Sequence, residues 1–419
     1  MRKLASVQRI LEVQDIKGKD RIGLATVLGW HVIVNKAEVK AGDLAVYFEI
    51  DSVLDKTNPV FAFMEKRNYR VKTLKMAGVV SQGLVMPLSA FPMLSNVKEG
   101  DDVTEALKVV KFEVNDEIEV VVRANKKDRL IKKLVSFIPS PIRRVLNKTV
   151  NFIKYSVLGI PQFAPFTGFP TEVSKTDEIR LQADPTLLET IKEVGQLYIT
   201  EKVDGSSSTF LLRAKKYTKL LGFLAKCKVM KDKCYDFVVC SRNRVAVPGS
   251  CYTEIAEKCN IKELLKAWMD NDPTLEFICL QGEVMGPKIQ GNKYGLKQNE
   301  LYAFNLISGP HFVIEDHLYL SGDNTAKANS VKRVEKFRYP MLPHITTMLA
   351  KYGIKAVPVL SYSCITPNKT VDDWVEFATG KSVLYDGPRE GIVVRNTSYE
   401  KQLLSFKVIN PEFLIKYKL

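Results

Sequence analysis

The sequence predicts an α+β protein with two domains, a small amino-terminal β-barrel and a larger domain built mainly on antiparallel strands. Its 419 residues exceed the size of one ordinary domain, and 46% apolar residues are enough to bury a sizeable core. Short strand-like runs punctuated by glycine fill residues 4–111, whereas strand and helix patterns mix from about residue 168 onward. Because strands and helices do not alternate regularly there, we expect no doubly wound parallel sheet.

The barrel is predicted from five short runs of strand-forming residues, at 5–13, 22–34, 44–50, 69–76 and 82–86. In the run from Lys66 to Lys75, cations occupy alternate positions, so a strand there would present one basic face, as in oligonucleotide-binding (OB) barrels. A solvated edge strand protected by lysines is the alternative. We expect an OB-like nucleic-acid-binding domain at residues 1–112, and we expect deletion of residues 1–110 to spare adenylation and impair sealing.

A basic linker is predicted over residues 113–166. Between Arg123 and Lys154 there are ten Lys or Arg residues and a single acid, and two prolines interrupt the helical spacing. Phosphate contact and a simple solvated linker both fit this composition. The second domain then covers residues 167–419, with helices expected at 184–194 and 254–269 and strands at 197–202, 276–283, 301–307, 391–395 and 403–408.

The charge balance favours a polyanionic partner. With 62 Lys and Arg against 47 Asp and Glu, the formal net charge is +15, and basic surface gains affinity for phosphates by releasing counterions. We find no apolar run long enough to span a membrane and no secretion signal. The odd number of cysteines, seven, without a Cys-x-x-Cys pair indicates an intracellular, reducing compartment. A zinc site at Cys227, Cys234 and Cys240 is an alternative whose spacing fits no common pattern.

The most informative short motif is Lys202-Val203-Asp204-Gly205, placed where a predicted strand ends in a tight turn. A lysine amine is a nucleophile only when it has lost its proton, which burial beside other cations or a metal ion favours. Alone, the motif more often means a salt-bridged surface turn. Five further elements follow in a fixed order: Ser241-Arg242-Asn243, Leu280-Gln281-Gly282-Glu283, Leu301-Tyr302-Ala303-Phe304, Glu390-Gly391-Ile392-Val393-Val394-Arg395 and Ser405-Phe406-Lys407-Val408.

This ordered set resembles the covalent nucleotidyltransferase superfamily of ligases and capping enzymes. Over nearly the whole chain the sequence looks like the ATP-dependent RNA ligases of the Deinococcus and Naegleria type, which carry an OB domain before an antiparallel-sheet nucleotidyltransferase, or adenylyltransferase, domain. The segment Lys175-Thr176-Asp177-Glu178 resembles the element that precedes the nucleophile in these ligases. The resemblance implies an ATP-dependent RNA ligase that joins 3′-hydroxyl and 5′-phosphate ends through a lysyl-AMP and an adenylated 5′ end.

The same resemblance implies a role for each motif residue. The expected catalytic residues are Lys202, Asp204, Arg242, Glu283, Glu390 and Lys407. Mg²⁺ or Mn²⁺, which prefer oxygen ligands, would be held by Asp204, Glu283 and Glu390. The nucleotide would contact Arg180, Thr200, Glu201, Lys202, Arg242, Phe304, Ile392, Val394 and Lys407. Phe304 and the 392–394 strand would enclose the adenine, although an aromatic at such a position is otherwise an ordinary core residue.

Two features depart from the family pattern. Arg242 follows Lys202 by 40 residues, farther than in related ligases, and the basic stretch 213–233 looks like the insertion that accounts for it. That stretch is either an RNA contact or a solvated excursion. Many ligases also have Lys-x-Lys in the last motif, whereas this sequence has Lys407 followed by Val408 and Ile409. Phosphate neutralisation then depends on Lys407, with Lys416 as a candidate substitute.

Three other functions compete with the RNA ligase interpretation. DNA ligases and mRNA-capping guanylyltransferases ordinarily continue into a carboxy-terminal barrel, while this sequence has twelve residues after Lys407, which favours an RNA ligase. A non-catalytic nucleic-acid-binding protein would require the whole motif set to be vestigial. We therefore expect a monomeric enzyme that acts on RNA, at a nicked duplex or at free 3′-hydroxyl and 5′-phosphate ends, in RNA repair.

Overall fold

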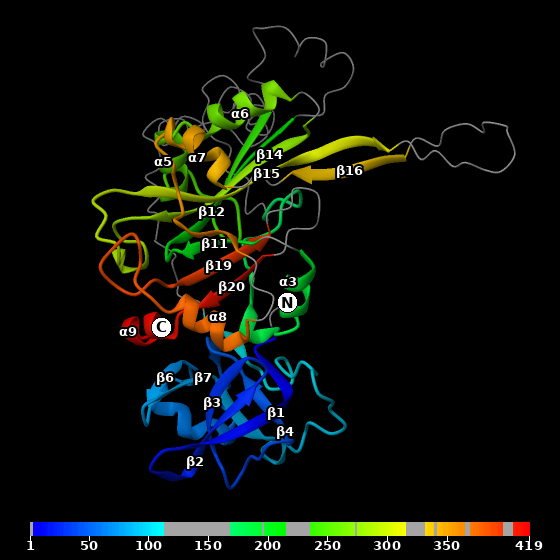
Figure 1. The fold of residues 1–419 in the computed structure, drawn as a ribbon, viewed down its shortest axis with the longest axis vertical. Coiled ribbons are helices and arrows are strands. Elements are labelled where there is room, and N and C mark those ends of the chain that lie inside the picture. The colour runs from blue at the N-terminus through cyan, green and yellow to red at the C-terminus, as the bar shows by residue number, and fades with distance from the viewer. Residues whose placement is uncertain are drawn as a thin grey trace, which may run out of the picture. The chain divides into compact units, whose positions relative to one another are not determined.

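The computed structural model describes residues 3–112, 168–194, 197–214, 235–272, 275–315, 332–338, 342–364, 369–396 and 405–419 (Figure 1). The chain divides into two compact units. The first contains residues 1–115, 177–204 and 357–419, and the second contains residues 116–176 and 205–356. The predicted linker at 113–166, with its basic insert at 123–154, lies outside the described residues, as does most of the stretch 213–233. The domain boundaries expected from the sequence therefore stay a prediction.

The predicted amino-terminal β-barrel is confirmed in the first unit. Its main antiparallel sheet has the order β3-β2-β1-β4-β8, with β1 Ala5–Ile16, β2 Lys19–Val27, β3 Trp30–Asn35, β4 Leu44–Phe48 and β8 Leu84–Pro87. Two small antiparallel pairs accompany it, β5 Ser52–Val53 with β9 Val110–Lys111, and β6 Thr73–Met76 with β7 Val79–Gln82. Alternate residues along β2 and β3 are buried, as expected for strands with one face on a core.

Two details of the barrel differ from the sequence prediction. The run 22–34 is two strands, because Leu28 adopts a left-handed φ of 53° and Gly29 completes the turn. The basic run 66–75 is not one strand. A 3-10 helix, η1 Pro59–Arg67, begins at the Asn58 cap, where the Asn58 side chain accepts a hydrogen bond from the Val60 N–H. Left-handed Asn68 ends the helix, so only residues 73–75 of the run extend as a strand, the first three residues of β6.

A second sheet in the same unit carries the nucleophile motif. Its order is β10-β20-β19-β11-β18, with β10 Ile179–Arg180, β11 Leu197–Lys202, β18 Val359–Cys364, β19 Gly391–Asn396 and β20 Ser405–Ile409. All pairs are antiparallel except β10 with β20. One face packs on α8 (Val371–Ala378), where Trp374 meets the Phe406 ring edge to face at 5.7 Å. The unit also holds η2 Leu88–Ala90, η4 Leu181–Ala183, α3 Leu187–Val194 and α9 Pro411–Tyr417.

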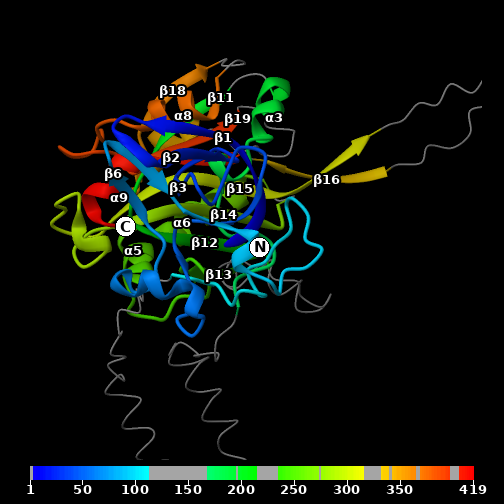
Figure 2. The same ribbon diagram turned by 90° about the horizontal axis from the view of Figure 1, so that it is seen from below.

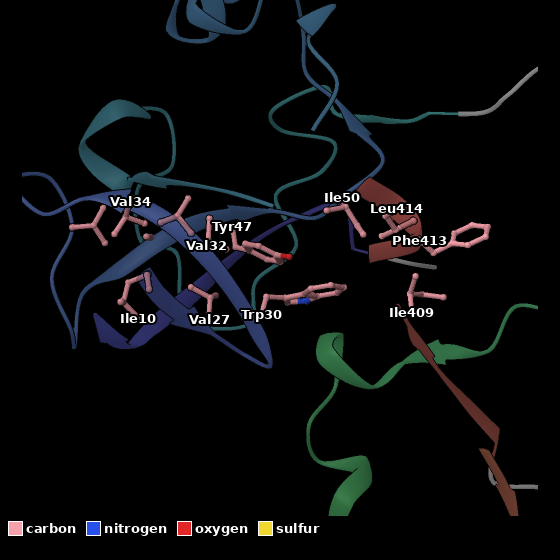
Figure 3. Close-up of a cluster of buried hydrophobic side chains, with 14 residues drawn as sticks. Ile10, Val27, Trp30, Val32, Val34, Tyr47, Ile50, Ile409, Phe413 and Leu414 are labelled. Atoms are coloured by element: carbon pink, nitrogen blue, oxygen red, sulfur yellow. The ribbon is translucent and has the colours of Figure 1, made fainter. Parts of the chain in front are cut away.

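The barrel and the last helix of the chain share one hydrophobic core. Ile409, Phe413 and Leu414 pack in the same buried cluster as Trp30 and Tyr47 of the barrel (Figure 3). Both ribbon views place α9 beside β6 (Figure 2). The Gly29 N–H also donates to the Gln182 carbonyl at 2.9 Å, and a Cβ on Gly29 would lie 2.9 Å from the Gln182 Cα. The barrel thus has one core of its own, around Phe48, Phe61 and Phe91, and a second core that it shares with the end of the chain.

The second unit is organised around a long antiparallel sheet. The order β13-β12-β14-β15-β16 comprises β12 Ser206–Ala214, β13 Tyr235–Cys240, β14 Phe277–Met285, β15 Glu300–Glu315 and β16 Lys332–Arg338, and β17 Lys355–Ala356 adds parallel to β15. The predicted helix at 254–269 is two helices, α5 Cys251–Lys258 and α6 Ile261–Asn271, separated at left-handed Asn260. The other helices in the described part of this unit are η6 Gln290–Asn292 and α7 Leu342–Ala350. No helix among the described residues could cross a membrane.

Candidate active site

Lys202 is the last residue of β11 and lies against the carboxylate of Glu390. The Lys202 Nζ donates to Glu390 Oε1 at 2.5 Å, and the two side chains are 22% and 14% exposed. Their strands fix this contact, because Lys202 pairs in register with Gly391, which immediately follows Glu390. A Cβ on Gly391 would collide with the Val408 carbonyl oxygen, so only glycine lets β19 pack this closely on β20. The predicted strand at 197–202 is thus confirmed, and its lysine is held in a polar, half-buried site.

The backbone that carries Glu390 is held by Asn410, the cap of α9. The Asn410 N–H donates to the Glu390 carbonyl, and its Nδ2 donates to the Arg389 carbonyl, both at 2.9 Å. Its Oδ1 accepts from the Glu412 N–H at 2.9 Å and so caps the helix. Asn410 is fully buried. Asn410 therefore fixes the start of α9 through its side chain, and it holds the 389–390 backbone through its side-chain amide and its own N–H.

A row of side chains crosses the sheet on the same face as Lys202. Arg180 of β10 pairs with Lys407 of β20, Lys407 pairs with Val393 of β19, and Val393 pairs with Thr200 of β11. Residues directly opposite one another on neighbouring strands share a face, and so do residues two apart, such as Thr200 and Lys202. The sheet therefore gathers three predicted site cations, Arg180, Lys202 and Lys407, on one face.

The charge of Lys407 depends on this neighbourhood. The side chain is 13% exposed, and burial together with the nearby charges of Arg180 and Lys202 lowers the pKa of Lys407 to about 8. Asp177 opposes the shift, because its Oδ1 accepts a hydrogen bond from the Lys407 Nζ at 2.7 Å. Lys407 should bind an anionic ligand readily, because the ligand's negative charge offsets the repulsion between the three cations.

The segment before Arg180 supplies two acids to which the sequence assigned no role. Asp177 binds Lys407, and Glu178 Oε1 accepts from Arg395 NH2 at 2.8 Å. Burial would raise the pKa of Glu178, but the charges of Arg395, Lys407 and Lys202 together keep it below its usual value. The match of residues 175–178 to the ligase element was the available signal, although it did not indicate these partners.

The other face of the same strands is a hydrophobic core. Ile392 and Val394 pack there with Leu197, Ile199 and Phe406, and both are fully buried. Val393, between them, belongs to the Lys202 face and is 8% exposed. The structure therefore does not bring the two predicted adenine contacts to the lysine. Strict alternation along β19 gives Val393 that place.

Glu201 also faces away from the row of cations. Its carboxylate accepts from the Ser382 hydroxyl at 2.5 Å and from the Val383 N–H at 2.8 Å. It thereby anchors the loop that leads from α8 to Glu390. Tyr385 in this loop donates to the Pro388 carbonyl at 2.5 Å. The pKa of Tyr385 is raised by burial, by the Tyr417 hydroxyl and by the charges of Asp204 and Glu201.

The second unit contains the remaining predicted site residues. Glu283 lies on β14 beside Gly282, where a Cβ would lie 2.8 Å from the Tyr302 carbonyl oxygen. The register passes from Gln281 opposite Asn305 to Gly282 opposite Ala303, so Phe304 is the extra residue of a β-bulge. A bulge redirects the side chain that it carries. Arg242 is exposed in the turn closed by the Ser241 N–H and the Arg244 carbonyl.

Among the residues that the structure describes, no three His, Cys, Asp or Glu side chains gather closely enough to hold an ion. Glu390 nevertheless retains one buried carboxylate oxygen, Oε2, that has no hydrogen-bond partner among the described residues. Such an oxygen suits a hard divalent cation or its bound water. In the alternative zinc set, Cys227 and Cys234 lie outside the described residues, and burial raises the pKa of Cys240 to about 12, which disfavours the thiolate ligand.

Comparison with known proteins gives consistent matches. A family model described as an OB-fold domain matches residues 4–88, and one described as RNA ligase matches residues 195–417. Naegleria gruberi RNA ligase solved with PPi is 26% identical, with a TM-score of 0.66 over 100% of this chain and 99% of that chain. A Lys-to-Ala mutant of that ligase with ATP and Mn is 26% identical, with a TM-score of 0.67 over 99% of both chains. No curated protein sequence matches the chain.

Proposed function

The chain belongs to the RNA ligase family, and from that premise we propose that it joins RNA ends at the expense of ATP, with Lys202 as the nucleophile. One observation carries the proposal. Lys202 contacts Glu390 at 2.5 Å and shares a sheet face with Arg180 and Lys407. A nucleophilic amine beside a cationic row suits attack on a polyphosphate. The similarity to a Naegleria ligase solved with ATP and Mn supports the choice of nucleotide and metal.

In the first step, the Lys202 amine forms a bond to the α-phosphorus of ATP, and the bond from that phosphorus to the bridging oxygen breaks. Pyrophosphate leaves, and the product is a lysyl-AMP. The lysine must first lose a proton, and Glu390 Oε1, 2.5 Å away, is positioned to accept it. Lys407 and Arg180 would neutralise the charge that builds on the phosphate oxygens. Arg242 would donate to the ribose or to a phosphate.

The metal ion would be held through Asp204, Glu283 and Glu390. The unsatisfied Oε2 of Glu390 supports this assignment in the first unit. For Glu283 the support is the order of the motifs in the sequence. When bound, Mg²⁺ or Mn²⁺ supplies positive charge that orients the phosphates and disfavours the protonated, cationic form of Lys202.

The adenine is proposed to contact Val393 and Phe304. Val393 supports this assignment because it is the residue of 392–394 on the Lys202 face. For Phe304 the support is its position at a β-bulge, which redirects its side chain relative to its neighbours on β15. Thr200, next in the row after Val393, would line the same surface. Glu201 would act through the loop that it anchors, so its contact with the nucleotide stays a prediction.

In the second step, a 5′-phosphate oxygen of the RNA attacks the lysyl-AMP, the phosphorus–nitrogen bond breaks and the 5′ end becomes adenylated. In the third step, a neighbouring 3′-hydroxyl loses its proton, attacks the adenylated phosphate and releases AMP. AMP is a better leaving group than the oxygen of an unmodified 5′-phosphate, which explains why ATP is consumed. We propose that the chain acts as a monomer on a nick or on two free ends.

Sealing assays test this function. Wild-type protein with ATP and Mn²⁺ or Mg²⁺ should join a nicked RNA duplex and accumulate the adenylated strand when the 3′-hydroxyl is removed. GTP should not replace ATP. Lys202→Ala should abolish joining of a 5′-phosphate nick while still sealing a strand that already carries 5′-AMP, since the third step does not use the amine. Faster joining of a matched all-DNA nick would instead assign a DNA ligase.

A further inference from the structure

We propose that two barrel carboxylates, Glu49 and Asp51, are positioning residues that hold Arg180 beside Lys407 for the step that consumes ATP. The inference rests on the proposed function, because it assumes that the row of cations receives the nucleotide's phosphates. It adds that the barrel shapes the nucleotide site itself through a buried ion-pair network.

The Arg180 guanidinium is held by both acids. Its NH1 lies 3.5 Å from Glu49 Oε1, and its NH2 lies 3.2 Å from Asp51 Oδ2. The side chains of Arg180 and Glu49 are 12% and 4% exposed. Glu49 directly follows β4 and Asp51 lies two residues further on, while Arg180 sits on β10 in register with Lys407. Two carboxylates on separate guanidinium nitrogens restrict both the direction and the rotation of the side chain.

Asp51 is itself fixed from the opposite side. Its Oδ1 accepts from Arg70 NH2 at 2.9 Å, and the Arg70 guanidinium lies 3.6 Å from the centre of the Phe112 ring. The Asp51 N–H and carbonyl are bonded to Val71 and Phe112, and its φ of 71° is left-handed. An ordinary residue rarely holds this conformation without a local reason. The barrel therefore presents the Asp51 carboxylate in one orientation.

Docking of the barrel does not account for this network. The shared apolar core around Phe413, the Gly29–Gln182 hydrogen bond and the His31–Asp372 contact at 2.9 Å already join the barrel to the rest of the unit. Buried ion pairs contribute little net stability, because desolvation offsets their attraction. The Arg180 Nε is also buried without a hydrogen-bond partner among the described residues. These ion pairs cost desolvation and leave the Arg180 Nε–H unsatisfied within the described part of the chain. Their role is therefore better explained as positioning the Arg180 charge than as stabilising the fold.

The consequence concerns the polyphosphate. Arg180 and Lys407 repel one another, as the lowered pKa of Lys407 reflects. An unrestrained arginine would turn toward solvent before ATP arrives and would lose side-chain entropy on binding. Glu49 and Asp51 prevent that movement, so the site meets the phosphates preorganised.

The test is the double variant Glu49→Gln/Asp51→Asn, which keeps the side-chain shapes and removes both charges. The half-saturating ATP concentration for Lys202 adenylation should rise about tenfold, as expected when an arginine–phosphate contact loses its orientation. Sealing of a strand that already carries 5′-AMP involves no polyphosphate and should be unchanged. Adding Arg180→Ala to the double variant should cause little further loss, since both changes remove the same contact.

Glu99→Gln is the matched control, because Glu99 pairs with Arg9 at 2.9 Å elsewhere on the barrel. It should leave the ATP dependence unchanged. The proposal is overturned if the double variant keeps wild-type ATP dependence, if it binds ATP more tightly, or if sealing of the adenylated strand falls equally. A lowered thermal midpoint with unchanged ATP dependence would likewise assign the acids to stability alone. Absence of adenylation in the wild type would instead refute the proposed function.

Discussion

Lys407 shows how one residue's chemistry follows from its neighbours. Desolvation and the charges of Arg180 and Lys202 lower the pKa of Lys407 to about 8, while Asp177 holds the proton against this shift. The sequence identified the lysine through its motif. It did not identify Asp177 as its partner, because the two lie 230 residues apart and meet only when β10 pairs with β20.

This environment predicts a pH-dependent affinity for ATP. Lys407 carries its charge below about pH 8 and loses it as the pH rises through that value, so ATP should bind about tenfold more weakly at high pH. Calorimetric titration of an ATP analogue with a methylene group between the α- and β-phosphorus into the wild-type protein isolates binding from chemistry and keeps the Lys202 charge that contributes to the lowered pKa of Lys407. Lys407→Arg, which stays charged throughout, should bind ATP with a much smaller pH dependence. An identical pH dependence in the arginine variant would show that another group titrates.

At the scale of single elements, the positions of regular strands were predicted well. Which side chains of a strand point to the core and which to the other face of the sheet was not predicted. The strand at 197–202 coincides with β11 because its apolar run ends at a charged residue and a turn. Strand 391–395 was also found, as β19, but its adenine contacts were assigned without regard to the sheet. Alternation buries Ile392 and Val394 in the core and leaves Val393 beside Lys407. A sequence shows this alternation only once the neighbouring strands and their register are known.

Asn410 caps α9 and also holds the backbone next to Glu390, so its loss should affect both the stability of the helix and the rate of adenylation. Asn410→Ala removes the side-chain donor to Arg389 and the cap of Glu412 and keeps the backbone donor to Glu390, so Glu390 should be held less firmly and adenylation should slow. We expect a loss of about 1 kcal/mol in the free energy of unfolding from the cap. We also expect adenylation to slow roughly tenfold, which is the size of effect expected when one catalytic group is misplaced.

Two variants separate these effects. Asn410→Ser offers the Glu412 N–H a hydroxyl acceptor, which is a favourable helix cap, and has no amide donor for Arg389, so it should restore much of the stability and not the rate. Thr370→Ala removes the corresponding cap of α8, where the Thr370 hydroxyl accepts from the Asp373 N–H, and should cost similar stability without slowing adenylation. Equal slowing by Thr370→Ala would mean that general destabilisation explains the Asn410 result. Rates come from single-turnover adenylation and stabilities from urea unfolding.

At the scale of the whole molecule, the barrel was predicted as a β-barrel but its dependence on the chain's last helix was not. Its strands follow local glycine and alternation signals. The packing of Phe413 and Leu414 on Trp30 and Tyr47 joins segments almost 400 residues apart, and no local pattern reports such a contact. The expectation that residues 1–110 can be removed without harm to adenylation therefore changes. Removal would expose Ile409, Phe413 and Leu414 beside Lys407, so we now expect both adenylation and sealing to fail.

The shared core predicts joint unfolding of the barrel and the catalytic sheet. Phe413→Ala should lower the free energy of unfolding by about 3–5 kcal/mol. Two single-tryptophan reporters, one retaining Trp30 in the barrel and the other Trp374 beside Phe406, should show coincident urea transitions that shift together. If only the Trp30 transition shifted, the barrel would be an independent folding unit.

The most direct test of the central claim is the site of covalent modification by ATP. After incubation with ATP and Mn²⁺, peptide mapping by mass spectrometry should find one AMP group per chain, attached to the side-chain nitrogen of Lys202. Lys202→Arg, which keeps the charge beside Glu390, should carry none. AMP on any other residue of the wild-type chain, or AMP retained by the Lys202→Arg variant, would contradict the account.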